Sequence, residues 1–225
     1  MQSTRLPKAT VYRLLWTLEQ DGLIQYEPKE NKYRLGYKML EYGGIVLENI
    51  DIRREAEPFL SELHNELGHM VMLAVRQQDS LQYLLRYDSE EGFQPLSFVG
   101  RRRMLHYGAL GILLMAYMPE ESARDIIKKN PLHPITPYTV TDEEIFFKRL
   151  RQIREQGFYI DVDEVFVGFT GVTIPVFGSR GEVDTVFGVI GNSFQFQGEY
   201  LEKVKRMALN TGLKISERLG YVKTT

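Results

Sequence analysis

The chain has 225 residues, of which 43% are hydrophobic and 26% charged, and it contains no cysteine. A chain of this length forms one or two domains with a substantial core. The lack of cysteine excludes a disulfide framework, a thiolate metal site and a cysteine nucleophile. No apolar run is long enough to span a membrane, and the first residues lack the apolar core of a signal peptide. We therefore expect a soluble, cytoplasmic protein that makes no membrane contact.

The formal net charge of −2 is unevenly distributed along the chain. Residues 1–38 carry seven basic and four acidic side chains, which gives this segment a charge of +3, and the remainder carries −5. A basic head on an acidic body favours contact between the head and a polyanion such as nucleic acid.

The first predicted element is a helix from Pro7 to Gln20. Proline suits the first turn of a helix, and Asp21-Gly22 suits its end. Apolar residues recur at helical spacing and predict one buried stripe, made by Val11, Leu14, Leu15 and Leu18. The exposed N-terminal half of this helix is small, hydroxylic and basic.

A β-hairpin is predicted next, because residues 23–26 and 33–36 form two short strand-like runs around a charged tip. A helix followed by a basic hairpin is typical of the second half of a winged helix-turn-helix. In that arrangement the helix enters the major groove and the wing lies along the phosphates. The pattern alone leaves open an ordinary surface unit with a solvated charged face.

The rest of the chain predicts an α+β domain, with helices flanking a mostly hairpin-connected sheet. Helices are predicted at residues 36–48, 52–67, 105–117, from 119 onward, from a capping box at 141–144 to Gly157, and at 199–219. Strands are predicted at residues 70–76, 81–87, 96–100, 158–161, 171–177 and 183–191.

The sequence offers little for catalysis. The four histidines form no pair at helical spacing, and no nucleophile-elbow or phosphate-loop string occurs. Asp161, Asp163 and Glu164 could supply a carboxylate pair for acid-base chemistry, but nothing nearby supplies a nucleophile or metal. A structural role for Asp163 and Glu164 is the alternative. We expect no enzymatic activity, no metal and no cofactor.

Residues 6–43 resemble the recognition helix, wing and linker start of the IclR family of bacterial transcription regulators. The resemblance rests on the run Leu-Pro-Lys-Ala-Thr-x-x-Arg-Leu-Leu and on a Tyr-Arg-Leu-Gly wing end. It continues through the body, where Leu105-His106 and Ala109-Leu110-Gly111 resemble the family's strand-to-helix junction. Residues 4–220 follow the family pattern almost without gaps.

This resemblance implies three parts in one α+β chain: a partial winged helix-turn-helix domain in residues 1–36, a linker helix in residues 37–50, and a GAF-like effector-binding and oligomerisation domain in residues 51–225. Its antiparallel sheet is flanked by helices. The implied function is a one-component transcriptional regulator, a homodimer or homotetramer on double-stranded operator DNA. Its DNA affinity would be controlled by a small organic acid.

The head departs from the family pattern, in which a first helix and most of a second precede the recognition helix. We therefore expect an N-terminally truncated domain that binds DNA poorly. The alternative function is a ligand-binding module that has lost DNA binding. The residues expected at the DNA groove and phosphates are Lys8, Ala9, Thr10, Tyr12, Arg13, Lys32 and Arg34.

In the family, the body segments converge on a small-molecule pocket at the open face of the sheet. The residues expected to bind the effector are Phe98, Gly100, Tyr107, Ala109, Leu110, Asp161, Gly171, Gly188 and Ile190. The start of the predicted helix 105–117 is expected to hold the carboxylate, because helix N-termini bind anions. The run from Arg101 to Arg103 either adds charge there or is a solvated cluster.

The predicted lining indicates the size of the effector. Relatives that bind very small acids carry polar residues at the positions of Gly171, Gly188 and Ile190. The lining here is more open and more apolar, so we expect a larger aromatic or alkyl acid. The two glycines could instead serve sheet packing or a bulge.

Overall fold

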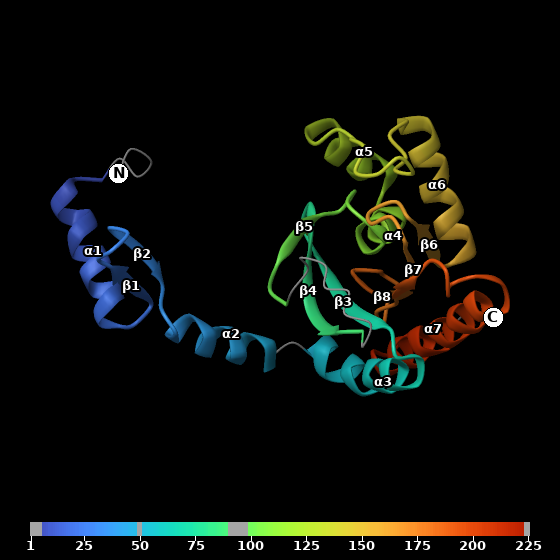
Figure 1. The fold of residues 1–225 in the computed structure, drawn as a ribbon, viewed down its shortest axis with the longest axis horizontal. Helices are drawn as coiled ribbons and strands as arrows, with labels where there is room; N and C mark the ends of the chain where they lie inside the picture. Colours follow the sequence, from blue (N-terminus) through green and yellow to red (C-terminus); the bar gives the residue numbers. More distant parts are fainter. Residues whose placement is uncertain (1–5, 49–50, 90–98, 223–225) are drawn as a thin grey trace. The chain divides into compact units, whose positions relative to one another are not determined.

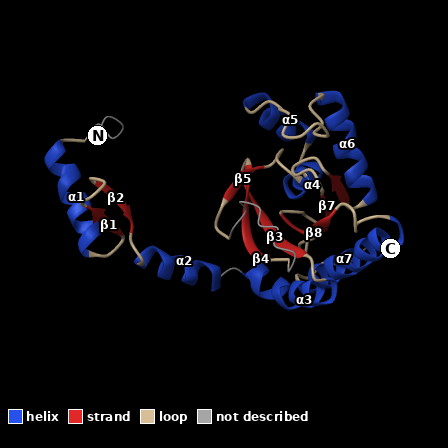
Figure 2. Ribbon diagram, viewed as in Figure 1, coloured by secondary structure: helices blue, strands red, loops and turns tan. Residues whose placement is uncertain are grey.

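The computed structural model describes residues 6–48, 51–89 and 99–222. The chain divides into two compact units, residues 1–51 and residues 52–225. Figure 1 traces the elements of each unit along the chain, and Figure 2 distinguishes their helices from their strands. Among the described residues, no helix is both long and apolar enough to cross a lipid bilayer.

The first unit contains the predicted helix and hairpin. Helix α1 spans Lys8–Gln20, strands β1 and β2 span Ile24–Glu27 and Lys32–Leu35, and helix α2 spans Lys38–Glu48. The two strands pair antiparallel, which places the rings of Tyr26 and Tyr33 opposite each other with centroids 5.1 Å apart. The predicted helix and hairpin are therefore confirmed.

The apolar stripe of α1 is only partly covered. None of the helix residues is fully buried, and Leu14 and Leu18 are 50% and 37% exposed. Val11 and Leu15 are half-buried. Leu14 and Leu18 are exposed because the described part of this unit places no element over that side of the helix.

A close approach of two glycines joins the hairpin to α1. A Cβ added at Gly36 would lie 2.0 Å from the carbonyl oxygen of Gly22, so only glycine fits there. The backbone N–H of Gly36 donates to the carbonyl of Leu23 over 2.8 Å. Because Gly36 closes the hairpin in this way, α2 begins at Lys38 rather than at residue 36.

The second unit is built on a six-stranded antiparallel sheet, in the order β5-β4-β3-β8-β7-β6. The strands are β3 Met70–Gln77, β4 Ser80–Tyr87, β5 Arg102–Met104, β6 Tyr159–Val162, β7 Phe169–Val176 and β8 Thr185–Asn192. Every neighbouring pair in it is antiparallel. This arrangement confirms the predicted α+β fold with an antiparallel sheet.

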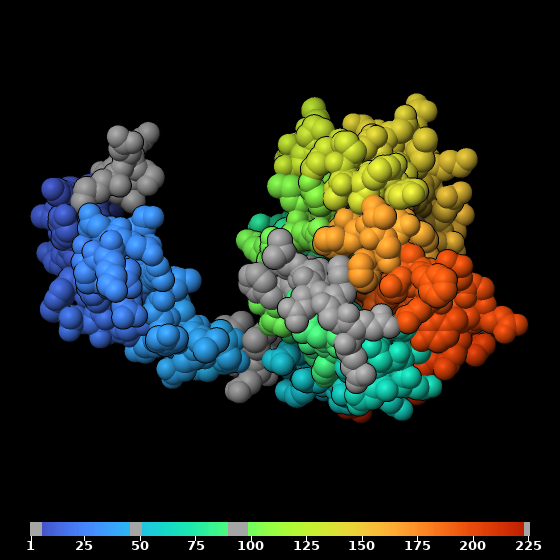
Figure 3. Space-filling model, in the orientation of Figure 1, coloured from blue at the N-terminus to red at the C-terminus, as the bar shows by residue number. Residues whose placement is uncertain are grey.

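Helices cover both faces of this sheet. One face carries α4, α5 and α6, which span Ala109–Tyr117, Glu120–Lys129 and Glu143–Gln156. The other carries α3 and α7, which span Asp51–Leu67 and Gly198–Arg218 and are joined by a 2.8 Å ion pair between Arg218 and Glu55. Figure 3 shows both layers at the surface of this unit, α5 and α6 in yellow-green, α3 and α7 in teal and red.

Helix α4 lies at the centre of the core. Its residues from Leu110 to Ala116 are all buried, as expected for a helix that is apolar on every side. It packs against β7 and β8 of the sheet and against α6. The start of α4 is therefore held firmly over the sheet.

The predicted helix 105–117 begins four residues later than expected. Leu105 to Gly108 form a turn, and Gly108 has a φ of 80°, which a right-handed helix cannot include. The turn brings the carbonyl oxygen of Leu105 across the helix, where a Cβ at Gly111 would lie 2.0 Å from it. The helix N-terminus is therefore at Ala109.

The third predicted strand is also displaced. Of the segment 96–100, residues 96–98 lie outside the described residues, and Val99 and Gly100 form a turn. The strand comes from the arginine run instead, since β5 pairs with β4 through Arg102 opposite Gln82. The N-cap of α6 is Asp142, one residue later than a capping box starting at Thr141 requires. The Oδ1 atom of Asp142 accepts a hydrogen bond from the N–H of Ile145 at 2.9 Å.

Candidate functional site

A cavity of about 70 Å³ lies between the start of α4, the sheet and the loop of residues 163–168. Residues of all six strands of the sheet line it, around the start of α4. Its walls comprise Met72, Tyr83, Arg103, Tyr107, Gly108, Ala109, Leu110, Asp161, Val165, Phe166, Phe169, Thr170, Gly171, Thr173, Gly188 and Ile190. The volume holds about five water-sized groups, so the cavity suits a small molecule.

Most of the predicted effector residues meet at this cavity. Those that line it are Tyr107, Ala109, Leu110, Asp161, Gly171, Gly188 and Ile190. Phe98 lies outside the described residues. Gly100 does not line the cavity, contrary to expectation, because it sits in a turn whose N–H donates to the carbonyl of Tyr83 over 2.9 Å.

Strand register explains why residues so distant in sequence share one floor. Asp161 pairs with Gly171, and Gly171 pairs with Ile190, so these three form one row across β6, β7 and β8. The next row on the same face contains Thr173, Gly188 and Met72. These two rows form the floor of the cavity.

The two glycines of the floor differ in their surroundings. A Cβ at Gly171 would lie 3.8 Å from side-chain atoms of Ala109 and Ile190, at ordinary contact distance. A Cβ at Gly188 would lie 3.3 Å from Leu110 Cδ2, which is a tight contact. Close packing therefore explains the glycine at 188, whereas the glycine at 171 leaves space open to the cavity.

One end of the cavity is electropositive. The first N–H groups of α4 have no intrahelical acceptor, and no side chain caps them. Arg103 reaches this end from β5, with its guanidinium carbon 5.6 Å from the ring centroid of Tyr107. Arg101 and Arg102 are exposed and do not line the cavity, so of the arginine run only Arg103 adds charge here.

Asp161 places a carboxyl in the cavity wall. Its side chain is only 7% exposed, and burial raises its pKa to about 7. A backbone hydrogen bond from the N–H of Glu164 to Oδ1, 3.0 Å long, partly offsets this rise. The carboxyl therefore exchanges its proton near neutral pH.

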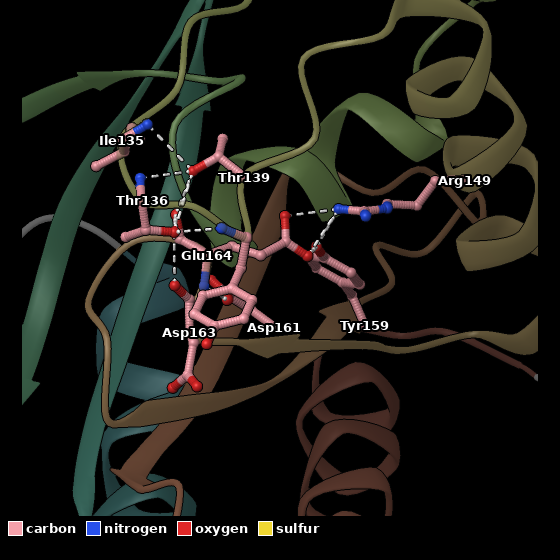
Figure 4. Close-up of polar contacts among 9 residues, drawn as sticks. Ile135, Thr136, Thr139, Arg149, Tyr159, Asp161, Asp163 and Glu164 are labelled. Atoms are coloured by element: carbon pink, nitrogen blue, oxygen red, sulfur yellow. Dashed lines mark hydrogen bonds and ion pairs between the residues drawn. The ribbon is translucent and has the colours of Figure 1, made fainter.

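The loop beside the cavity is anchored to α6 by an ion pair. Arg149 Nη1 lies 2.6 Å from Glu164 Oε2, and both side chains are largely buried. The hydroxyl of Tyr159 donates to Glu164 Oε1 over 2.8 Å (Figure 4). Glu164 thus holds the loop in place, which agrees with the structural role predicted from the sequence as the alternative to catalysis.

Two threonines hold the same loop by its backbone. Thr136 Oγ1 donates to the carbonyl of Asp163 at 2.8 Å, and Thr139 Oγ1 donates to that of Glu164 at 2.7 Å (Figure 4). Asp163 Oδ1 accepts from the N–H of Gly168 and from Ser193 Oγ. Within the described ranges, no three His, Asp or Glu side chains gather as a metal site.

The predicted DNA-contacting residues lie on α1 and β2. Thr10 is half-buried. The others are exposed: Lys8, Ala9, Tyr12, Arg13, Lys32 and Arg34. Lys8 Nζ lies 5.8 Å from the ring centroid of Tyr12. Arg34 forms a 2.5 Å ion pair with Glu30 at the hairpin tip, so a phosphate would compete with Glu30 for it.

Residues 44–217 match the family model of the bacterial transcriptional regulator IclR C-terminal domain. The chain belongs to the IclR family. It is 30% identical over 220 residues to the HTH-type transcriptional regulator KdgR of Escherichia coli K12, covering 98% of this chain and 84% of that protein. It is also 30% identical over 216 residues to XynR of the same organism, covering 96% of this chain and 86% of that protein.

Solved structures agree with this assignment. The Thermotoga maritima IclR superposes with a TM-score of 0.80 and 26% identity, covering 98% of this chain and 89% of that one. The resemblance predicted from the sequence is therefore confirmed. The chain is an IclR-family transcriptional regulator with an effector-binding C-terminal domain, and its relatives are regulators rather than enzymes.

Several residues of this regulator's cavity were missed by sequence reasoning. Phe169 and Thr173 stand two residues either side of Gly171 on the same strand, so period-two alternation could have identified them. The sequence indicated Arg103 only as one of three consecutive arginines, and the place of β5 at the sheet edge next to β4 brings Arg103 to the cavity.

Proposed function

We propose that this IclR-family regulator binds double-stranded operator DNA through α1 and the β1–β2 hairpin, and that a small organic acid in the cavity below α4 controls that binding. The observation that carries the proposal is the composition of the cavity. An electropositive end, formed by the start of α4 and Arg103, faces the apolar part of the floor, which contains Gly171 and Ile190. This arrangement suits a carboxylate attached to an apolar body.

The proposed effector is an aromatic or alkyl carboxylic acid. Its carboxylate binds the first turn of α4 and Arg103, and its body covers the space above Gly171. Because the pKa of Asp161 is about 7, this residue can carry a proton and donate to the effector instead of repelling it. An IclR homologue from Microbacterium hydrocarbonoxydans, with a TM-score of 0.78 and 23% identity, is complexed with 4-hydroxybenzoate, which supports an aromatic acid.

For the DNA complex we propose that Lys8, Ala9, Thr10, Tyr12 and Arg13 face the major groove. Lys32 and Arg34 of the wing bind phosphates. We further propose a homodimer or homotetramer, so that two recognition helices read an inverted repeat. The apolar residues exposed on α2, such as Leu40 at 78%, support association through that helix.

A thermal-shift screen of carboxylic acids, followed by a gel shift on an inverted-repeat operator, tests the proposal. We expect aromatic or medium-chain acids to raise the melting temperature and to change operator affinity, since a ligand stabilises the state it binds. Stabilisation by glyoxylate-sized acids alone would contradict the proposed effector class. Acid binding without a salt-dependent operator shift would favour the ligand-binding module that has lost DNA binding.

A further inference from the structure

A buried histidine lies behind the wall of the effector cavity without a hydrogen-bond partner among the described residues. His106 is 8% exposed, and neither Nδ1 nor Nε2 bonds to another protein atom. Buried polar groups in folded proteins nearly always have a partner, and an unpaired one is destabilising. The position of His106 therefore indicates a partner that is not part of this fold.

A second, smaller cavity adjoins this histidine. Its volume is about 20 Å³, which is room for about one water-sized group. Polar side chains are frequent in its wall, where His106 is joined by His133, Thr139, Arg149 and Glu164. Arg149 and Glu164 are already paired with each other at 2.6 Å, so their charges are balanced. The cavity therefore suits one small, neutral polar group.

The two cavities share one wall. Tyr107, Gly108 and Val165 line both of them. The ring of Tyr107 is half-exposed and lies 4.8 Å from the ring of His133 between centroids. Gly108 adds no side chain to this wall, where a Cβ would come within 3.3 Å of Val165 Cγ2. The two cavities are therefore neighbours, separated by these three residues.

The protonation of His106 defines the chemistry of this group. Burial, with a smaller effect of His133, lowers the pKa of His106, so the ring is neutral at pH 7. A neutral imidazole has one donor and one acceptor nitrogen. A hydroxyl group also donates and accepts, and it fits the volume available.

We infer that the cavity at His106 is a second subsite of the effector pocket, where His106 hydrogen-bonds a hydroxyl group of the effector. This inference rests on the proposed function, because it assumes that an organic acid occupies the larger cavity. It narrows the effector class to hydroxylated acids. Val165 and Tyr107 then separate the apolar part of the effector from its hydroxyl.

The test compares benzoate with its three monohydroxy isomers, titrated calorimetrically into the full chain at neutral pH. We expect the wild type to bind one isomer about tenfold more tightly than benzoate, the effect of one well-formed hydrogen bond. His106→Leu should bind benzoate as the wild type does and lose that preference. His106→Gln should keep part of it, because its amide can still bond.

His106→Leu should fold, because neither ring nitrogen has a hydrogen-bond partner to lose among the described residues. Its melting temperature should equal or exceed that of the wild type. The subsite is overturned if the wild type binds no hydroxybenzoate more tightly than benzoate. It is also overturned if His106→Leu keeps the same preference as the wild type. Either result leaves the proposed function intact. Failure of all four acids to bind also overturns the subsite, whereas the proposed function is overturned only if no aromatic or alkyl acid of the wider screen binds.

Discussion

The backbone N–H of Glu164 donates to Oδ1 of Asp161 over 3.0 Å, while the carboxylate of Glu164 binds Arg149 at 2.6 Å. A single residue thus connects the buried carboxyl of the cavity below α4 to helix α6. The carboxyl of Asp161 depends on Glu164 for its hydrogen bond, and the loop depends on Arg149 for its position. This relationship makes the cavity wall sensitive both to pH and to substitutions on α6.

Asp161→Asn should change how stability depends on pH. The pKa of an aspartate is about 4 in the unfolded chain and about 7 for Asp161 in the folded one. The folded state therefore binds the proton more tightly, and wild-type stability falls as pH rises from about 4 to about 7. The free energy of unfolding of Asp161→Asn minus that of the wild type should therefore increase by about 2 to 3 kcal/mol between pH 5 and pH 8.

Urea denaturation followed by circular dichroism at both pH values measures this difference. Asp125→Asn, at an exposed position of α5, is the control and should show no such change. A constant difference between Asp161→Asn and the wild type would mean that Asp161 is ionised throughout that range.

Arg149→Met should destabilise the second unit by about 2 to 4 kcal/mol, because it leaves the largely buried carboxylate of Glu164 without its cation. Acid binding should weaken as well, since the loop lines the cavity. The matched control on α6 is Arg151→Met, whose ion pair with Glu120 is exposed and should be worth less than about 1 kcal/mol. The double variant Arg149→Met/Glu164→Gln should be less destabilised than Arg149→Met alone. If its loss of stability instead equals the sum of the losses of the two single variants, Arg149 and Glu164 do not act as a pair.

Gly171→Leu should abolish acid binding with little effect on folding. A Cβ at this position meets its neighbours at 3.8 Å, so the backbone tolerates a side chain, and the added atoms occupy the cavity. We expect affinity for the stabilising acid to fall more than tenfold, and the melting temperature of the unliganded chain to change by only a few degrees. Val162→Leu, on an exposed side chain of β6, is the control. Unchanged affinity in Gly171→Leu would place the acid elsewhere.

Arg13→Ala should weaken operator binding by about 5- to 100-fold, the range for loss of a base contact, and leave acid binding unchanged. Lys32→Ala should weaken binding to all DNA sequences and reduce the slope of log K against log salt by about 1. Gel shifts at several salt concentrations measure both, with Arg180→Ala as an exposed control in the second unit. Loss of acid binding in Arg13→Ala would identify Arg13 as a structural residue.

The sequence predicts the elements of this fold well where the signal is local. The period of the apolar residues identifies α1, α3 and α7, and the strand-like runs identify the β1–β2 hairpin and β3. Prediction fails at the start of α4, because the turn at Gly108 follows from the packing of Leu105 against Gly111. Such a contact leaves no periodic pattern.

The family and the main cavity residues also follow from the sequence, since the resemblance places Ala109, Asp161 and Gly171 at the pocket. The tertiary structure alone decides what these residues do together. The register of β6, β7 and β8 sets Asp161, Gly171 and Ile190 side by side. Burial then shifts the pKa of Asp161 and leaves His106 without a hydrogen-bond partner in the described part of the chain. Periodicity depends on neighbours within one turn or one strand, whereas burial, pKa and cavity shape depend on segments that only folding brings together.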